Sequence, residues 1–194
     1  MWEIKYLPIQ AWIATMDMFT NEELARIAET PGEEMKARVG FRDGHGDYDP
    51  RQRESDVRWI NPRPDTEWLF QIIEEAVIEF NKHFMMRLTH IHDLQLTEYD
   101  GTNGGHFGAH IDDAWGVLKP HGRRKLSICV QMSEPEEYDG GELRLYPQGL
   151  NYVTMPKQRG MAVVFRSHIV HEVTPVTRGK RRSLVIWASG PYAE

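Results

Sequence analysis

Two histidines and one carboxylate have residue types and a spacing that suit a metal ion. His110 and Asp112 lie two residues apart, so in a β-strand both side chains point to one face. His171 opens another alternating, apolar segment further along the chain. On a neighbouring strand it would complete a set of two imidazoles and one carboxylate, which leaves open positions on an octahedral metal such as Fe(II).

Other histidines and acids fit this pattern less well. His45 and Asp47 repeat the spacing, but glycines surround them, and we expect His45 to be an ordinary loop histidine. Strand alternation aims Asp113 away from Asp112, and His168 is three residues from His171, so we expect a loop position for it. A hydrogen-bonded surface pair remains the alternative for His110 and Asp112.

Arg181 is the candidate for holding an anionic cosubstrate. On its strand it shares one face with Ser183, Val185 and Trp187. An arginine inside an apolar barrel needs a carboxylate partner, and a guanidinium beside a hydroxyl suits the distal carboxylate of a dicarboxylic acid. The alternative is a surface position, because Arg181 also belongs to the basic cluster 178–182.

The segment 124–133 also alternates. Its apolar face carries Leu126, Ile128, Val130 and Met132, whereas Ser127, Cys129 and Gln131 form the other face. Such a small, polar face suits the wall of a ligand-holding barrel, but a solvent-facing surface has the same pattern.

Composition excludes several classes of protein. The chain has 194 residues, and 23 Lys and Arg against 29 Asp and Glu give a net charge of −6, which disfavours nucleic acid as a partner. A single cysteine, Cys129, excludes an internal disulfide framework and a cysteine-rich zinc finger. The sequence has no signal-peptide pattern and no membrane-spanning apolar run, so we expect a cytoplasmic protein with no membrane partner.

The elements that must position these residues change type along the chain. The first ~15 residues are expected to be extended, Thr20 and Glu23 form a capping-box pattern before a short helix, and 39–56 is expected to be a long exposed loop. Apolar spacing predicts an amphipathic helix over roughly 65–82. Beyond residue 90 the period becomes two, which predicts six short strands with no helical crossovers. These strands are written LQLTEY, RKLSICVQMS, GELRLYP, MAVVFRS, HEVTPVT and RSLVIWA. The pattern predicts an α+β, mainly β fold that closes as a jelly roll.

Three ordered segments resemble a known family. TEYDGTNGGHFGAHIDD, RRKLSICVQMSEPEEYDGGELRLY and GMAVVFRSHIVHEVTPVTRGKRRSLVIW look like the catalytic core of 2-oxoglutarate and Fe(II)-dependent dioxygenases, in the prolyl 4-hydroxylase-like branch. The resemblance covers roughly 95–191. It implies a double-stranded β-helix core at 91–194 in a single domain spanning 1–194. The N-terminal strand, helices and lid-like loop at 1–90 would support that core.

The resemblance also implies roles for individual residues. His110, Asp112 and His171 would ligate iron, and Arg181 would pair with the C5 carboxylate of 2-oxoglutarate. Tyr99, Ser127 and Ser183 correspond to positions of further cosubstrate contacts, Trp187 would line the pocket, and Gln131 stands where some members have Tyr. Fe(II), 2-oxoglutarate and O2 would react to give succinate and CO2, with ascorbate in a supporting role.

The substrate is less constrained than the cofactors. The family branch implies a peptidyl proline in a peptide or protein, while lysine, a free amino acid or a nucleobase remain open. We expect the rim of the pocket at 39–56 and after Asp112, with Trp59 and Trp115 able to stack on a proline and Arg53, Arg58 and Arg123 able to hold a peptide. The rival interpretations are a zinc-dependent cupin-like hydrolase, a non-enzymatic jelly-roll binding module and a nucleic-acid demethylase, which the net charge disfavours and the basic cluster 178–182 favours. The sequence gives no oligomeric state.

Overall fold

The computed structural model describes residues 11–16, 18–42, 45–113 and 122–192. Within these residues the strands form a nine-stranded sheet, a five-stranded sheet and a hairpin, accompanied by two α-helices. The predicted α+β, mainly β fold is confirmed. No helix in this described part of the chain is long and apolar enough to cross a bilayer.

The larger sheet is antiparallel and centres on a long strand near the C-terminus. Its order is β1 (Trp12–Thr15), β14 (Ala162–Arg166), β10 (Arg123–Gln131), β16 (Val176–Gly190), β8 (Leu94–Asp100), β6 (Asp56–Ile60) and β2 (Glu33–Lys36). Two short strands also pair with β16, namely β7 (His90–Ile91) and β11 (Tyr138–Gly140), and a 3-10 turn at Pro135–Glu137 precedes β11.

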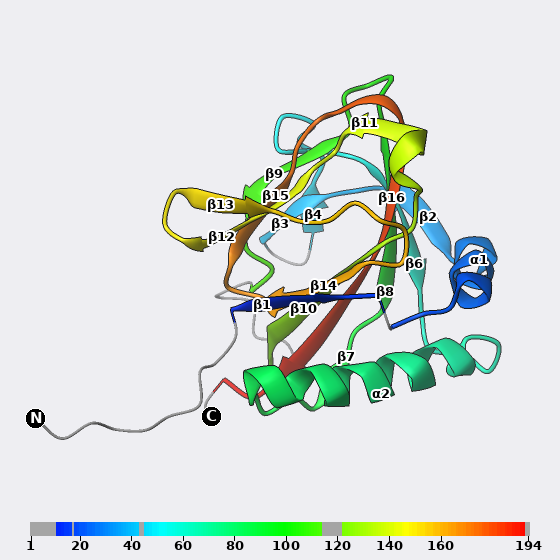
Figure 1. Ribbon diagram of the computed structural model, residues 1–194, viewed down its shortest axis with the longest axis vertical. Coiled ribbons are helices and arrows are strands. Elements are labelled where there is room, and N and C mark those ends of the chain that lie inside the picture. The colour runs from blue at the N-terminus through cyan, green and yellow to red at the C-terminus, as the bar shows by residue number, and fades with distance from the viewer. Residues whose placement is uncertain (1–10, 17, 43–44, 114–121, 193–194) are drawn as a thin grey trace, which may run out of the picture.

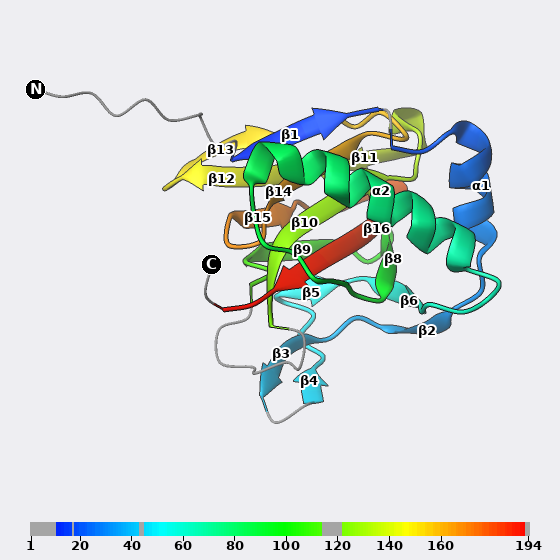
Figure 2. The same cartoon turned by 90° about the horizontal axis from the view of Figure 1, so that it is seen from below.

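The smaller sheet has the order β13 (Asn151–Thr154), β12 (Leu143–Gln148), β15 (Val170–Val173), β9 (His106–His110) and β5 (Arg53–Glu54). Residues of both sheets meet in one buried cluster, in which Tyr99 and Phe165 come from the larger sheet and Leu143, Leu145 and Val173 from the smaller one. The two sheets therefore pack face to face as a jelly roll (Figures 1 and 2).

Both helices form where the sequence predicts them. Helix α1 (Asn21–Glu29) begins with the predicted capping box, in which the Thr20 side chain accepts from the Glu23 backbone and Glu23 accepts from the Thr20 backbone. The helix expected over 65–82 is α2 (Glu67–Phe84), shifted by two residues at each end. It crosses the outer face of the larger sheet (Figure 2).

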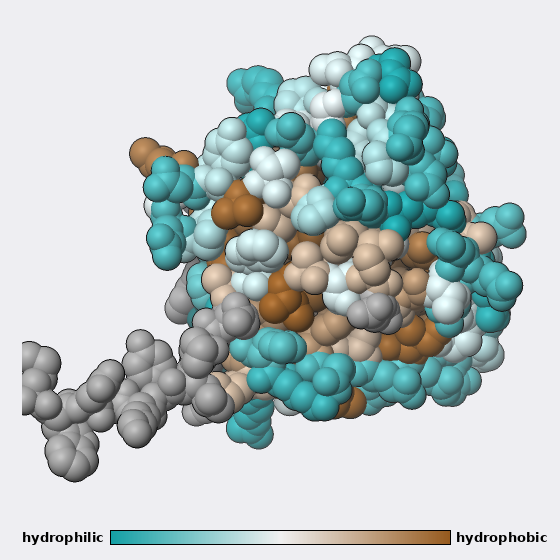
Figure 3. All heavy atoms as spheres, viewed as in Figure 1, coloured by the Kyte–Doolittle hydropathy of each residue, from teal (hydrophilic) through white to brown (hydrophobic). Residues whose placement is uncertain are grey.

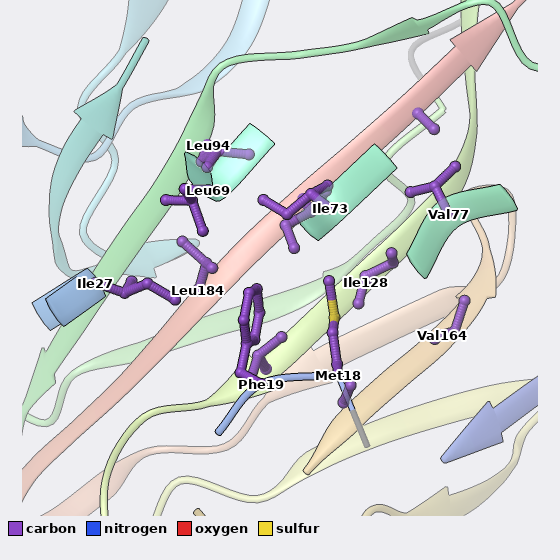
Figure 4. Packing of buried hydrophobic residues seen from close by; sticks show 14 of the residues in the cluster. Met18, Phe19, Ile27, Leu69, Ile73, Val77, Leu94, Ile128, Val164 and Leu184 are labelled. Carbon is purple, nitrogen blue, oxygen red and sulfur yellow. The ribbon is translucent and has the colours of Figure 1, made fainter. Parts of the chain in front are cut away.

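Helix α2 covers the apolar face of the central strands. Leu69, Ile73 and Val77 point from α2 toward Ile128 of β10 and Leu184 of β16, and all five are buried (Figure 4). Ser127, Cys129 and Gln131 consequently face the other sheet, because alternate residues of a strand point to opposite sides. The solvent side of α2 is hydrophilic, and apolar residues gather between α2 and the β12–β13 hairpin (Figure 3).

Two expectations about local structure need correction. The segment 39–56 is not one long loop, because it contains the hairpin β3 (Val39–Arg42) and β4 (His45–Asp47) as well as β5, so His45 begins a strand. HEVTPVT is not one strand: β15 ends at Val173 and β16 begins at Val176. The proline between them lacks the N–H that a continuous strand needs. Of the expected N-terminal extended segment, Trp12–Thr15 forms β1, and residues 1–10 lie outside the described residues.

Candidate metal centre and cosubstrate pocket

The structure brings His110, Asp112 and His171 together. His110 ends β9, Asp112 follows it, and His171 lies on β15 directly opposite His110 in the antiparallel register. One ligand atom from each residue lies within 4.8 Å of the others, and no other such group of three occurs in the described part of the chain. The predicted grouping of two imidazoles and a carboxylate, which could bind a metal, is confirmed.

Backbone carbonyls orient both imidazoles toward the group. Nδ1 of His110 lies 2.8 Å from the Gly108 carbonyl oxygen, and Nδ1 of His171 lies 3.0 Å from that of Ile169. A carbonyl only accepts, so Nδ1 carries the proton, and the lone pair of the neutral ring resides on Nε2. Burial, followed by the neighbouring His171, lowers the pKa of His110 to about 3. His110 is therefore neutral near pH 7, as a metal ligand must be.

The carboxylate of Asp112 is held from behind. Its Oδ2 accepts from Ser127 Oγ at 2.7 Å, and Ser127 Oγ lies 2.8 Å from Ser167 Oγ. His110 and His171 approach it through Nε2, with His110 at 3.7 Å from Oδ1 and His171 at 3.5 Å from Oδ2. Burial opposes ionisation, but the neighbouring histidines, His171 foremost, outweigh it and lower the pKa of Asp112. The carboxylate is ionised and fixed in orientation.

Aromatic rings enclose the two histidines. The ring of Phe107 stacks on His110 with centroids 3.5 Å apart, and Phe165 meets His171 edge to face at 4.7 Å. Both rings line the inner cavity together with the three candidate ligands. Access of water to the group is therefore limited, which strengthens electrostatic interactions inside it.

Arg181 is a fully buried cation on the inner face of β16. Its exposed fraction is 0%, and Nη1 donates to Ser183 Oγ at 3.3 Å. Nε and Nη2 are buried and make no hydrogen bond. An uncompensated buried charge costs free energy. A carboxylate ligand would compensate this guanidinium and accept hydrogen bonds from its two free donors.

Other buried polar groups in the barrel also lack hydrogen-bond partners. The buried Tyr138 hydroxyl and Gln131 Oε1 also make no hydrogen bond, and burial raises the pKa of Tyr138, so its hydroxyl keeps the proton. Gly141 has φ 57°, and a Cβ there would lie 2.8 Å from Arg181 Cδ. The turn at Gly141 can pack over Arg181 only without a side chain. This part of the barrel therefore fits a bound dicarboxylic acid.

The remaining candidate residues separate into two groups. Tyr99, Ser183 and Trp187 line the inner cavity beside the metal group, as does Cys129, whose pKa burial raises. Gln131 is buried opposite Ser183 in the register of β10 and β16. Ser127 instead contacts Asp112 and Ser167 and is absent from the cavity wall.

A groove of about 700 Å³ leads from the surface to His110 and Asp112. Of the residues expected at the rim, Trp59 and Arg53 line this groove. Arg58 lies in a separate pocket and pairs with Glu34, while Arg123 pairs with Asp113. Trp115 lies outside the described residues.

Arg53 reaches deeper than the sequence indicates. It is 6% exposed, donates to Ser55 Oγ at 2.9 Å and to Gln95 Oε1 at 2.8 Å, and its guanidinium lies over the Phe107 ring. Gln95 also lines the inner cavity, and sequence reasoning did not select it. Alternation within LQLTEY could have placed Gln95 on the face of Tyr99, but no pattern identifies the pairing of β5 with β9 that brings in Arg53.

The residues that were not expected to bind the metal or the cosubstrate lie outside the candidate site. Asp113 turns away from the metal group to Arg123, and His168 lies in the turn between β14 and β15. Arg178, Lys180 and Arg182, the neighbours of Arg181, are exposed and paired with acids. Only Arg181 of these four points inward, so the surface alternative for it is wrong.

Comparisons with known proteins identify the family of this region. Residues 94–189 match the model of the 2OG-Fe(II) oxygenase superfamily. A PKHD-type hydroxylase of Paracoccus denitrificans (strain Pd 1222) is 40% identical over 103 residues, which cover 51% of this chain and 44% of that protein. One of Paraburkholderia phytofirmans (strain DSM 17436 / LMG 22146 / PsJN) is 36% identical over 118 residues, covering 58% of this chain and 50% of that protein. The chain therefore matches half or less of these relatives' length.

Solved structures share the fold over nearly the whole chain. A Pseudomonas putida prolyl-4-hydroxylase has a TM-score of 0.68 at 21% identity and covers 93% of this chain and 92% of its own. A Trichoplax adhaerens prolyl hydroxylase, solved in complex with a hypoxia inducible factor peptide fragment, has a TM-score of 0.71 at 16% identity, covering 92% and 83%. The expected likeness to prolyl 4-hydroxylase-like 2-oxoglutarate oxygenases is confirmed.

Proposed function

We propose that this chain, whose residues 94–189 form a 2OG-Fe(II) oxygenase domain, hydroxylates a peptidyl proline. One observation carries the proposal: a fully buried arginine with two unsatisfied donors lies in the same barrel as a His-Asp-His group. A bare metal site has no use for such a cation, whereas a dicarboxylic cosubstrate does. In this family Fe(II), 2-oxoglutarate and O2 together supply the oxidising chemistry and yield succinate and CO2.

The metal ligands in this proposal are His110, Asp112 and His171. They present the Nε2 atoms of two imidazoles and one ionised carboxylate, a donor set that suits Fe(II) and leaves open positions on it. Gly108 and Ile169 carbonyls fix the rings, and Ser127 fixes the carboxylate. These contacts hold the ligands in place before the metal binds, which reduces the cost of ordering them.

Arg181 binds the distal carboxylate of 2-oxoglutarate through Nε and Nη2, with Ser183 as its neighbour. Tyr99, Ser183 and Trp187 line the inner cavity beside the metal group, and Gln131 lies opposite Ser183 in the register of β10 and β16. We give Ser127 the role of positioning Asp112 rather than of contacting the cosubstrate, because its hydroxyl is engaged there. Ascorbate would support the reaction by returning oxidised iron to Fe(II).

The substrate would enter by the groove that Trp59 and Arg53 line. The Trp59 and Trp187 rings lie 6.1 Å apart at 35°, and they form an apolar wall against which a pyrrolidine ring can pack. A prolyl hydroxylase of the same fold was solved with a peptide, which supports a peptide or protein substrate. Cytoplasmic peptides or proteins are the class we propose, with no membrane and no nucleic acid as partner.

The test is mass spectrometry of proline-containing peptides after incubation with Fe(II), 2-oxoglutarate, ascorbate and air. The expected result is an addition of one oxygen on proline, matched by succinate release and absent under nitrogen. Succinate release without any modified proline would overturn the proline assignment and leave the oxygenase assignment intact. Oxygen-independent turnover with zinc would overturn both.

A matched pair of variants tests the assignment of Arg181. Arg181→Met should weaken 2-oxoglutarate binding by on the order of 100-fold or more, whereas Arg182→Met, at the neighbouring residue that faces solvent and Glu98, should leave it unchanged. Equal losses in both variants would contradict a specific role for the buried arginine. Direct titration of 2-oxoglutarate into the metal-loaded protein provides the measurement.

A further inference from the structure

A second, basic pocket adjoins the groove that leads to the metal centre. It has a volume of about 310 Å³ and lies beside the C-terminal end of α2. Its lining residues are Met86, Asp113, Arg123, Arg124, Lys125, Arg166, His168 and Tyr192. Arg124 also lines the substrate groove, and the consecutive residues Asp112 and Asp113 belong to the groove and to this pocket respectively. The substrate groove and the basic pocket are therefore direct neighbours.

Positive charge dominates this basic pocket. Among the described residues that line it, Asp113 is the single acid, and both of its oxygens accept from Arg123. Arg166 donates to the Phe84 carbonyl oxygen, which carries no full charge. Among these described residues, the charges of Lys125 and Arg166 therefore have no acidic partner, while the Arg124 guanidinium lies over the Trp187 ring, 3.8 Å from its centroid. In accord with this, burial and then Arg166 lower the pKa of His168.

Lys125 is the least expected of these cations. It is 9% exposed, and its ammonium is buried without a hydrogen-bond partner. The register of β10 against β16 shifts between Arg124 and Leu126, so a β-bulge at Lys125 turns this side chain out of the regular alternation. Nε of Arg124 is also buried and unpartnered. A buried ammonium next to a half-buried guanidinium costs stability unless an anion compensates the ammonium.

We propose that this basic pocket binds an anionic group, a carboxylate or a phosphate, through Lys125 and Arg124. Both ligand types accept several hydrogen bonds and carry the charge that the pocket lacks. Because Arg124 is shared, an acidic group on a substrate lying in the groove can reach the same site, and a free phosphate ion has the same chemistry. The substrate source rests on the proposed hydroxylase activity, whereas binding of the free ion does not.

The first arm of the test measures binding of inorganic phosphate to the full-length chain by thermal shift at constant ionic strength. Phosphate should raise the Tm of the unmodified protein by about 3–6 °C at roughly ten times its Kd. Lys125→Met keeps the length of the side chain and removes the charge, so the phosphate response should disappear while the Tm without phosphate stays equal or rises. Lys82→Met, at an exposed lysine of α2, is the matched control.

Arg181→Met excludes the other candidate anion site. If phosphate acted at the cosubstrate pocket, Arg181→Met would lose the response and Lys125→Met would keep it, which would overturn the proposal. The proposal is equally overturned when the unmodified protein does not respond to phosphate and its KM values in the second arm do not depend on peptide charge.

The second arm compares hydroxylation of two peptides that differ only by Asp or Asn beside the target proline. A substrate source predicts a KM about tenfold lower for the Asp peptide, with the preference lost in Lys125→Met and kcat on the Asn peptide preserved. Equal KM values together with a Lys125-dependent phosphate response assign the pocket to the free ion. If no peptide is hydroxylated, the proposed function fails, and the phosphate arm alone decides the anion site.

Discussion

The two faces of the nine-stranded sheet are formed by the same strands but have different roles. The outer face packs against α2, and the inner face lies toward the candidate site. On the outer face, Leu184 and Ile128 pack against Ile73 of α2 and are almost fully buried (Figure 4). On the inner face, the adjacent residues Ser183 and Ser127 are equally buried but polar. Each strand therefore alternates between a residue that stabilises the fold and a residue that faces the site.

The two faces also differ in how many of their buried polar atoms make hydrogen bonds. The outer cluster consists of hydrophobic side chains that need no partner. The inner face and its surroundings contain buried polar atoms without hydrogen bonds, on Arg181, Gln131, Tyr138 and Trp187. Native proteins contain few such atoms, and each one costs free energy. Their concentration beside the His-Asp-His group indicates that a ligand, rather than the protein itself, satisfies them.

The largest expected effect is at a proposed metal ligand, His171, which the five-stranded sheet contributes to the site from the side opposite the inner face. His171→Ala should reduce metal affinity by more than about 100-fold and bring hydroxylation to background, because removal even of a ligand's supporting contact costs 10–100-fold. Metal titration by calorimetry and succinate release provide the measurements. The exposed histidine of α2 gives the control His83→Ala, which should behave as the unmodified protein. Undiminished metal uptake by His171→Ala would contradict the ligand assignment.

Arg181→Met should separate function from stability on the inner face. Loss of a buried charged partner costs about 2–5 kcal/mol of binding, so the KM for 2-oxoglutarate should rise by on the order of 100-fold or more. The free energy of unfolding should stay equal or increase, because the variant removes an uncompensated buried charge. Urea unfolding without ligand checks the second part, and a loss of several kcal/mol there would contradict the comparison of the faces.

Leu184→Ala should have the reverse signature on the outer face. Truncation of this fully buried leucine leaves a cavity beneath α2, and we expect a loss of about 2–5 kcal/mol in the free energy of unfolding. The KM for 2-oxoglutarate should be unchanged, since the side chain faces away from the pocket. Urea unfolding and steady-state kinetics on the folded protein test both parts. A KM rise like that of Arg181→Met would contradict separate roles for the two faces.

Alternation and helical spacing made much of this arrangement predictable. The period of two in RKLSICVQMS separates Ile128 from Ser127, and the apolar spacing around Ile73 predicts the helix that covers Ile128. The same period identifies His110 and Asp112 as one group. The period alone could not show which face of β10 points toward the other sheet, because burial depends on what packs against each face. The position of α2 on the apolar face determines it.

Long-range pairing is what the sequence pattern could not supply. The segment 39–56 has the glycines and charges of a loop, yet β5 within it pairs with β9 and carries Arg53 into the site. Charged residues are ordinarily exposed, so a composition argument places Arg53 at the rim. Here Ser55, Gln95 and the Phe107 ring satisfy the guanidinium and make its burial tolerable. Such compensation involves residues distant in sequence and has no local signature.

The smallest effect should come from Ser127, which lies on the inner face but is not among the residues that line the inner cavity. Its hydroxyl donates to Asp112 Oδ2 and adjoins Ser167, so Ser127→Ala removes one fixed contact of a metal ligand and leaves the ligand itself. We expect metal affinity to fall about 10-fold, within the range for supporting contacts, with KM for 2-oxoglutarate little changed once metal is saturating. Metal titration and kinetics at saturating Fe(II) distinguish this from a cosubstrate role. A KM increase that excess metal does not correct would show that Ser127 contacts the cosubstrate, and would add Ser127 to the residues of β10 that face the ligand.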